Sequence, residues 1–183
     1  MGHRLSKIYT RTGDEGSTGL GDGTRTGKDS PRIASLGEVD ELNSVIGVLL
    51  AEQLPEAVRD ALAGVQHDLF DLGGELCIPG RTAVSDAQVT RLETLLDGFN
   101  ADLAPLKEFI LPGGARAASL AHLARTVCRR AERSVVRLGQ GEAVADATRR
   151  YLNRLSDLLF VLGRVLNHAA GRGDVLWQQG RNK

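Results

Sequence analysis

The chain has few aromatic side chains: they make up only 4% of its 183 residues, with a single tryptophan. Leucine, valine, alanine and isoleucine must therefore fill the core, and this length suffices for one domain with a substantial interior. Net charge is also absent, because 23 lysines and arginines balance 23 aspartates and glutamates. This balance argues against a nucleic-acid-binding protein with a broad basic surface, although it permits a local basic pocket for a small anion.

Cysteines and long hydrophobic runs are scarce as well. Cys77 and Cys128 lie far apart in apolar segments, and no Cys/His spacing resembles a zinc site. We interpret them as buried free thiols, which predicts a reducing, cytoplasmic compartment. No apolar run approaches the length of a membrane span, and Met1–Lys7 leads directly into polar sequence, so we expect neither a membrane segment nor a signal peptide. The absence of a Glu-x-x-His pair disfavours a di-iron or di-manganese bundle.

What the chain does contain is a polar, glycine-rich stretch over residues 9–23, with five glycines, three threonines and one serine. Glycine lets the backbone turn N–H groups onto an anion, and hydroxyls and cations such as Arg25 and Lys28 complete such a site. The stretch lacks the Gly-Lys-Ser/Thr ending of a Walker P-loop. We therefore predict a different type of phosphate-binding loop over residues 1–30, with a short strand at Lys7–Thr10.

The remainder of the chain has the apolar periodicity of helices. Five amphipathic segments follow one another, and short links containing proline, glycine or polar residues separate them. The expected helices are Ser35–Gln53, Glu56–Cys77, Ser85–Asp102, Ala115–Leu138 and Ala143–Ala170. The pattern predicts an all-α fold in a single domain, residues 1–183: a five-helix antiparallel bundle over residues 35–171 and a C-terminal tail over residues 172–183.

The fourth expected helix carries a row of arginines. Arg125, Arg129 and Arg133 are four residues apart, so they share one face of the helix. A solvated basic face is the usual role of such a run. This helix is also strongly apolar on another face and must be packed, and the planar fork of arginine binds two phosphate oxygens at once. Binding of an anion by this row of arginines is therefore the more specific of the two interpretations.

Two further helices carry polar residues with two possible explanations each. Asn153 and Asp157 share a face of the fifth expected helix, where poor helix formers indicate either a functional role or interhelical hydrogen bonds. Asp40 lies in the first turns of the first expected helix. Acidic residues there favour the helix dipole, and a specific partner among the arginines of the fourth helix is the alternative.

Taken together, the motifs of this chain resemble the PduO-type ATP:cob(I)alamin adenosyltransferases. They extend from about residue 7 to residue 160 in the order found in that family, and this order makes the resemblance strong where any one motif would be weak. The matching segments are Tyr9–Leu20, Lys28–Asp29, Gly37–Asn43, Phe109–Gly114, Arg125–Arg133 and Tyr151–Asp157.

The resemblance implies a five-helix bundle that assembles as a homotrimer, with active sites between neighbouring subunits. It also implies transfer of the 5′-deoxyadenosyl group of ATP to the cobalt of cob(I)alamin, which gives adenosylcobalamin and triphosphate. Mg²⁺ would accompany the nucleotide, with no metal ligand assigned among the protein side chains. A reductase and an adenosylcobalamin-dependent mutase are the expected further partners.

Matched motif by motif, the resemblance implies roles for individual residues. Phe109 and Asp157 would bind cobalamin, and together with Arg129 they are the expected catalytic residues. Asp40 and Arg125 would form a salt bridge across the subunit interface. The ATP-binding residues would be Thr10, Arg11, Thr12, Gly13, Thr18, Gly19, Lys28, Arg129, Arg130, Glu132, Arg133 and Asn153.

The chemistry of this reaction agrees with the residues present. Cobalt is itself the nucleophile, so the protein needs none, and the charge that grows on the departing triphosphate calls for fixed cations and N–H donors. An apolar wedge such as Phe109 would exclude water and an axial ligand from cobalt, with ordinary packing as the alternative. Two other functions stay open: a corrinoid carrier or chaperone, and a different ATP-using or ATP-sensing bundle. The triphosphate-type loop favours the enzyme over the carrier.

Overall fold

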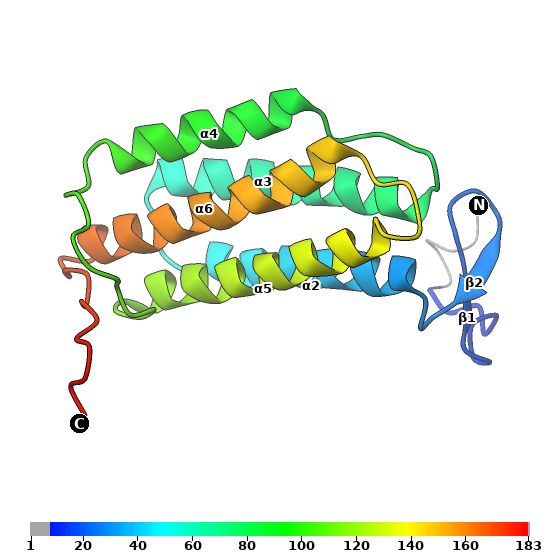
Figure 1. The fold of residues 1–183 in the computed structure, drawn as a ribbon, viewed down its shortest axis with the longest axis horizontal. Coiled ribbons are helices and arrows are strands. Elements are labelled where there is room, and N and C mark those ends of the chain that lie inside the picture. Colours follow the sequence, from blue (N-terminus) through cyan, green and yellow to red (C-terminus); the bar gives the residue numbers. More distant parts are fainter. Residues whose placement is uncertain (1–7, 183) are drawn as a thin grey trace.

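Five long helices lie side by side along a common axis in the computed structural model, which describes residues 8–182 (Figure 1). Successive helices run in opposite directions, so the expected all-α antiparallel bundle is confirmed. None of the helices in this part of the chain is both long and apolar enough to cross a membrane. The helices are α2 (Pro31–Leu50), α3 (Glu56–Cys77), α4 (Asp86–Asn100), α5 (Arg116–Leu138) and α6 (Asp146–Ala169).

The helix boundaries agree with the sequence where a terminating signal is local. The expected bounds of α3 are confirmed, and Ser85 caps α4 through a capping box with Gln88. The expected start of the first helix at Ser35 is wrong: α2 begins one turn earlier, because the Ser30 hydroxyl caps the helix and Pro31 occupies its first position. The last helix, α6, begins at Asp146, three residues later than expected.

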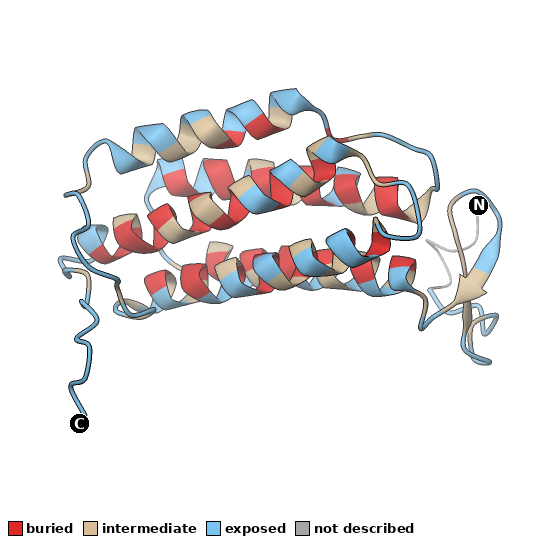
Figure 2. Ribbon diagram, in the orientation of Figure 1, coloured by how far each residue is buried: buried red, intermediate tan, exposed pale blue. Residues whose placement is uncertain are grey.

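The core is a single apolar interior enclosed by α2, α3, α5 and α6, with α4 packed against α6 (Figure 2). Leucine dominates it, as the low aromatic content predicts. The inward face of α5 is instead built from alanines, which lets α2 and α6 approach its backbone closely. These fully buried alanines are Ala118, Ala121, Ala124 and Ala131.

Buried polar contacts fix α3 relative to α6. The hydroxyl of Tyr151, the largest fully buried side chain, donates to Oδ2 of Asp68 at 2.8 Å. Closer to the end of α3, the buried Glu75 accepts from the Thr148 hydroxyl of α6 and from a backbone N–H of the link before α4. Each pairing satisfies polar groups that burial would otherwise leave without a partner.

The N-terminal segment forms a small hairpin at the end of the bundle where α2 begins and α3 ends (Figure 1). Strands β1 (Ser17–Gly19) and β2 (Arg25–Gly27) pair antiparallel. The strand expected at Lys7–Thr10 is wrong over residues 8–10, since Ile8 has a φ of 61°, outside the β region, and Lys7 lies outside the described residues. The hairpin itself was signalled by an Asp-Gly turn dipeptide at residues 22–23.

Candidate functional site

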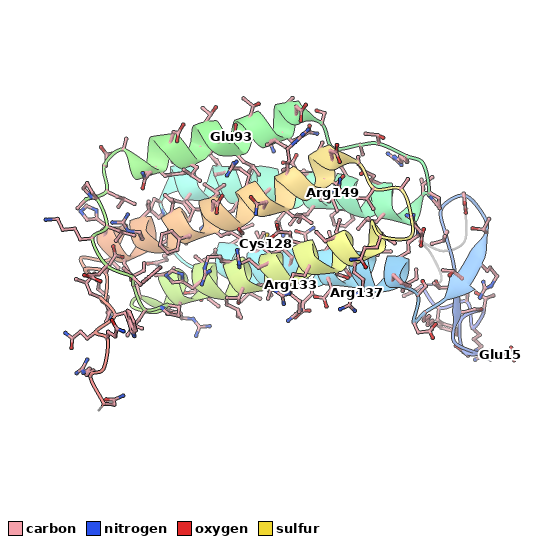
Figure 3. The ribbon with its side chains drawn as sticks, in the orientation of Figure 1. Glu15, Glu93, Cys128, Arg133, Arg137 and Arg149 are labelled. Carbon is pink, nitrogen blue, oxygen red and sulfur yellow. The ribbon has the colours of Figure 1, made fainter. Side chains whose placement is uncertain are left out.

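A cationic groove lies between the C-terminal half of α5 and the start of α6. Its volume is about 450 Å³, and three arginines contribute to its lining. Figure 3 shows two of them, Arg133 and Arg137, one after the other along α5 toward the end of the bundle that carries the hairpin. The lining residues are Arg129, Glu132, Arg133, Val136, Arg137, Gln140 and Asn153.

The charge in this groove is largely uncompensated by the protein. Glu132 is its one carboxylate, and that side chain accepts a hydrogen bond from Nδ2 of Asn153 at 3.0 Å. Within residues 8–182, none of the arginines of the groove forms an ion pair. Instead, a guanidinium nitrogen of Arg133 donates to the carbonyl oxygen of Arg129 at 3.1 Å. The groove therefore has the charge and the guanidinium forks that binding of a multiply charged anion would require.

Arg130 differs from its neighbour Arg129 in orientation. Its guanidinium faces α2, where Nε lies 2.5 Å from Oε2 of Glu38 and a second nitrogen pairs with Glu41. Hydrogen bonds to Glu41 and Glu38 raise the pKa of Arg130 above its ordinary value. The structure thus brings Arg129, Glu132, Arg133 and Asn153 together in the groove, while Arg130 joins α5 to α2.

A second, more apolar pocket lies further along the same helices. It has a volume of about 590 Å³ and includes Phe109, whose side chain is 78% exposed at its mouth. The other lining residues are Leu106, Lys107, Glu108, Ile110, Arg125 and Phe160. Three of the seven lining residues are charged, and the other four are apolar. An exposed aromatic ring beside the apolar side chains of Leu106, Ile110 and Phe160 is typical of a surface that binds a large, mainly apolar partner or ligand.

The groove and the pocket adjoin each other through residues of α5 and α6. Arg129 lines the groove and Arg125 lines the pocket, and one helical turn of about 6 Å separates them. On α6, Asn153 lines the groove and Phe160 lines the pocket. Asp157 lies between these two positions and accepts a hydrogen bond from Arg154 at 2.7 Å. One continuous surface therefore offers cations at one end and apolar side chains at the other.

Arg125 is the least satisfied cation of this surface. Its Nε is buried and has no hydrogen-bond partner within the described residues. Burial, and secondarily the neighbouring Arg129, lower the pKa of Arg125. An acidic group from outside this chain would relieve both effects.

The predicted partner of Arg125, Asp40, lies elsewhere within one chain. The Ser35–Ser134 and Glu38–Arg130 contacts set the register of α2 against α5, and this register places Arg125 level with Ser44. Asp40 instead lines an apolar groove of about 490 Å³ between α2 and α3, next to the exposed ring of Phe70. The structure of one chain therefore does not bring Asp40 and Arg125 together.

Internal contacts give the N-terminal segment a compact shape. The Arg25 guanidinium donates to the carbonyl oxygen of Thr12 and to the hydroxyl of Ser17, both at 2.6 Å. The backbone N–H of Lys28 donates to the Gly16 carbonyl at 2.9 Å. The side-chain ammonium of Lys28 lies so close to Gly13 that a Cβ on Gly13 would be 3.2 Å from the ammonium nitrogen. This arrangement holds two cations, Arg25 and Lys28, within one small loop, and cations of this kind are part of an anion-binding loop.

The segment is attached to the bundle at α3 and not at α5 or α6. The N–H of Gly21 donates to the carbonyl of Cys77 at 2.8 Å, and a Cβ at Gly21 would lie only 2.5 Å from the Ile78 side chain. Among the described residues, no hydrogen bond or ion pair connects residues 10–28 to α5 or α6. One chain therefore does not bring the predicted loop residues Thr10, Arg11, Thr12, Gly13, Thr18, Gly19 and Lys28 into contact with the groove.

Sequence reasoning missed several residues of this surface. Arg137 continues the four-residue spacing of the arginine row, so the signal for it was present. Trp177 lies beside the apolar pocket, with its ring 6.3 Å from that of Phe109 in an edge-on arrangement. No local pattern connects residues so far apart in the sequence.

Comparison with known proteins gives consistent matches over almost the whole chain. The family profile described as Cobalamin adenosyltransferase matches residues 8–166. A "Cobalamin adenosyltransferase" of Cupriavidus metallidurans is 65% identical over 182 residues, 99% of both chains. A "Corrinoid adenosyltransferase" of Bacillus subtilis is 48% identical over 180 residues, 94% of this chain and 93% of the relative.

Solved structures match the fold equally well. One is a phenylalanine-to-alanine variant of the PduO-type ATP:corrinoid adenosyltransferase from Lactobacillus reuteri, complexed with cobalamin and ATP. Its TM-score is 0.90 at 34% sequence identity, and the match covers 94% of this chain and 100% of that one. An arginine-to-lysine variant of the L. reuteri enzyme, complexed with ATP, gives a TM-score of 0.88 at the same identity and coverage.

The different orientations of Arg130 and Arg133 predict different losses on substitution. Arg130→Ala removes two partly exposed ion pairs, so we expect the free energy of unfolding to fall by about 0.5 to 1 kcal/mol. The affinity of the Arg130→Ala variant for tripolyphosphate, measured by calorimetry, should stay within about twofold of wild type. Arg133→Ala should weaken the affinity for tripolyphosphate on the order of tenfold. Equal losses of tripolyphosphate affinity in the two variants would contradict this assignment.

Proposed function

The chain belongs to the cobalamin adenosyltransferase family, and we propose that it transfers the 5′-deoxyadenosyl group of ATP to the cobalt of cob(I)alamin. The observation that carries the proposal is the continuous surface along α5 and α6, with a cationic groove at one end and an apolar pocket at the other. A triphosphate fits the first and a corrin ring the second. Their junction is where the two reacting atoms would meet.

The groove holds the part of ATP that leaves. Arg129 and Arg133 supply guanidinium forks to the phosphate oxygens, and Glu132 keeps the Asn153 amide oriented. Charge on the triphosphate grows as the C5′–O bond breaks. Cations that are already fixed in place stabilise that charge without reorganising, which lowers the barrier more than it strengthens binding of ATP.

The transfer itself needs no nucleophile from the protein. The cobalt of cob(I)alamin donates an electron pair to C5′, the Co–C bond forms, and the C5′–O bond breaks with its electron pair on the triphosphate. Cys128 is unsuited to compete: its thiol is fully buried, burial raises its pKa, and its Sγ lies 3.2 Å from the Leu152 carbonyl oxygen. The protein's contribution is alignment and electrostatics.

The apolar pocket favours the reactive state of cobalt. The Phe109 ring and the apolar side chains around it exclude water and an axial ligand from the lower face of the corrin. Cob(II)alamin without an axial ligand is easier to reduce, because the ligand field that resists the incoming electron is gone. We expect Asp157, between groove and pocket, to orient the corrin.

Mg²⁺ would enter with the nucleotide. Within residues 8–182, no three His, Cys, Asp or Glu side chains gather into a metal site. Mg²⁺ that accompanies a nucleotide is usually held by phosphate oxygens and water. Glu132 is the carboxylate of the groove that would reach it, and the ion would neutralise charge on the triphosphate.

The complete site requires more than one subunit, and we propose a homotrimer. The N-terminal segment is attached to α3, away from the groove, so a neighbouring subunit would supply Thr10–Lys28 to the nucleotide. A cross-subunit contact between Asp40 and Arg125 would compensate the buried, unpartnered guanidinium nitrogen. The apolar groove around Phe70 would be covered in the same assembly.

We place the reaction in the cytoplasm, which is supported by two free cysteines. A reductase would supply the electron that forms cob(I)alamin, and a mutase that uses adenosylcobalamin would receive the product. Both partners follow from the chemistry of substrate and product.

Arg129→Ala tests the reaction and the groove together. Wild-type protein, mixed anaerobically with ATP, Mg²⁺ and cob(I)alamin, should produce the absorption spectrum of adenosylcobalamin. The variant should lose about 10²- to 10³-fold in kcat, because it removes a fixed cation from the leaving group. Arg150→Ala is the matched control, since Arg150 pairs with Asp86 outside the groove and should keep kcat within about twofold. Folded wild-type protein without product would refute the enzyme and favour a carrier.

Phe109→Ala tests the corrin pocket. We expect the four-coordinate Co(II) signal of bound cob(II)alamin, seen by electron paramagnetic resonance in the presence of ATP, to disappear largely, because water and the axial ligand regain access to cobalt. The affinity for ATP should be unchanged. Leu111→Ala removes an exposed side chain from the same segment and serves as control. An unaltered Co(II) spectrum in Phe109→Ala would remove Phe109 from the site.

Asp40→Asn tests the assembly. Loss of the carboxylate should leave Arg125 buried without a counter-charge, so the trimer should dissociate at higher protein concentration than wild type in light-scattering measurements. Exchanging the charges, with Asp40→Arg and Arg125→Asp in one chain, should restore part of the trimer. Asp60→Asn, an exposed position of α3, is the control. Unchanged dissociation in Asp40→Asn would separate Asp40 from the interface.

A further inference from the structure

The C-terminal tail folds back onto the segment that carries Phe109. Ile110 and Leu176 form an antiparallel bridge, and two backbone hydrogen bonds flank it. The Leu111 N–H donates to the Val175 carbonyl at 2.8 Å, and the Trp177 N–H donates to the Phe109 carbonyl at 2.7 Å. With the edge-on contact between the Phe109 and Trp177 rings, residues 175–177 pack against the segment that supplies Phe109 and Ile110 to the apolar pocket.

One buried arginine of α6 contacts both the tail and the link that leads to Phe109. Arg164 is only 6% exposed, and its Nε donates to Oδ2 of Asp174 at 2.8 Å. A second nitrogen of the same guanidinium donates to the Ala104 carbonyl at 2.7 Å. Ala104 lies in the link from α4 that leads to Phe109, and Asp174 immediately precedes the tail residues that pair with it. A single guanidinium therefore sets the relative position of the two segments.

The ion pair is sequestered from solvent. The Asp174 side chain is 17% exposed, and its second carboxylate oxygen is buried without a partner among the described residues. His122, on the adjacent face of α5, is also buried, and burial lowers its pKa, so Arg164 and not His122 supplies the counter-charge near neutral pH. Removing one partner of a buried pair leaves an uncompensated charge, so substitution of either residue should strongly weaken this contact.

We propose that Asp174, through its ion pair with Arg164, positions residues 175–177 against the Phe109 segment and thereby shapes the pocket that receives the corrin. The identity of the ligand rests on the proposed function. Asp174 and Arg164 are positioning residues, because they act through the tail and the α4–α5 link and touch no reacting atom. Without the pair, the tail would lose its fixed position beside Phe109, and the Phe109 segment would lose its contacts with residues 175–177.

The sole tryptophan of the chain, Trp177, gives a direct readout of tail docking. In Asp174→Asn, we expect red-shifted Trp177 emission and increased quenching by acrylamide, both measured without ligands. The dissociation constant for cob(II)alamin, measured by calorimetry with ATP present, should rise roughly tenfold, and that for ATP should stay within about twofold. Asp174→Glu keeps the charge and should restore most of both signals.

Two further variants complete the test. Asp102→Asn makes the same change at an exposed position of the α4–α5 link and should alter neither readout. Arg164→Lys keeps a cation but loses the guanidinium fork that also reaches Ala104. We therefore expect it to shift Trp177 fluorescence and cob(II)alamin affinity in the same direction as Asp174→Asn. It takes the place of Asp174→Asn if that variant does not fold.

Two results would overturn the proposal. Unchanged Trp177 emission and quenching in a folded Asp174→Asn variant would show that the pair does not hold the tail, and the same result in Arg164→Lys would show that the guanidinium fork does not. A released tail with unchanged affinity for cob(II)alamin would show that the tail does not shape the pocket. Failure of the proposed function is distinguishable, because neither fluorescence nor ligand affinity requires turnover: wild type that binds cob(II)alamin tightly but makes no adenosylcobalamin refutes the transferase alone.

Discussion

Uncompensated positive charge along one face of α5 is the constraint on which the site depends. The opposite face of α5 includes alanines that pack closely against α2 and α6, so the helix cannot rotate to turn Arg129, Arg133 and Arg137 toward the acidic residues of α2 that pair with Arg130. Arg129, Arg133 and Arg137 consequently lie together in one groove without ion pairs among the described residues. Glu132 is the one carboxylate among these arginines, so a bound anion would offset most of the repulsion within the row and would couple the stability of the site to its ligand.

The straight course of α5 also explains why the cationic groove and the apolar pocket lie one after the other along the bundle. A step of four residues along α5 moves from the phosphate-type groove at Arg129 to the apolar pocket at Arg125, and a parallel progression on α6 leads from Asn153 to Phe160. A triphosphate and a flat apolar ring bound to this surface must therefore meet at their edges. Alignment of two substrates on rigid helices is an effective way to accelerate a reaction in which the protein supplies no reactive group.

Much of this could be predicted from the sequence because its signals are local. Apolar periodicity and the Pro55 boundary predict α3 to the residue, and the spacing of Arg129 and Arg133 predicts a shared face. The orientation of Arg130 could not be predicted in this way, since it depends on Glu38 and Glu41 of another helix. The contact of the tail with the Phe109 segment joins residues more than sixty positions apart, and no periodicity encodes it. Roles taken from family resemblance also stay predictions where, as for Asp40, they require a second subunit.

We propose that groove and pocket form one site in which ATP and the corrin meet at a shared edge. A crystal structure of the assembled protein with ATP and cobalamin bound would show whether they do. We predict triphosphate oxygens on Arg129 and Arg133, the corrin face against Phe109, and C5′ of ATP directed at cobalt near Asp157. A triphosphate bound outside the α5–α6 groove, or a corrin bound away from Phe109, would contradict the account.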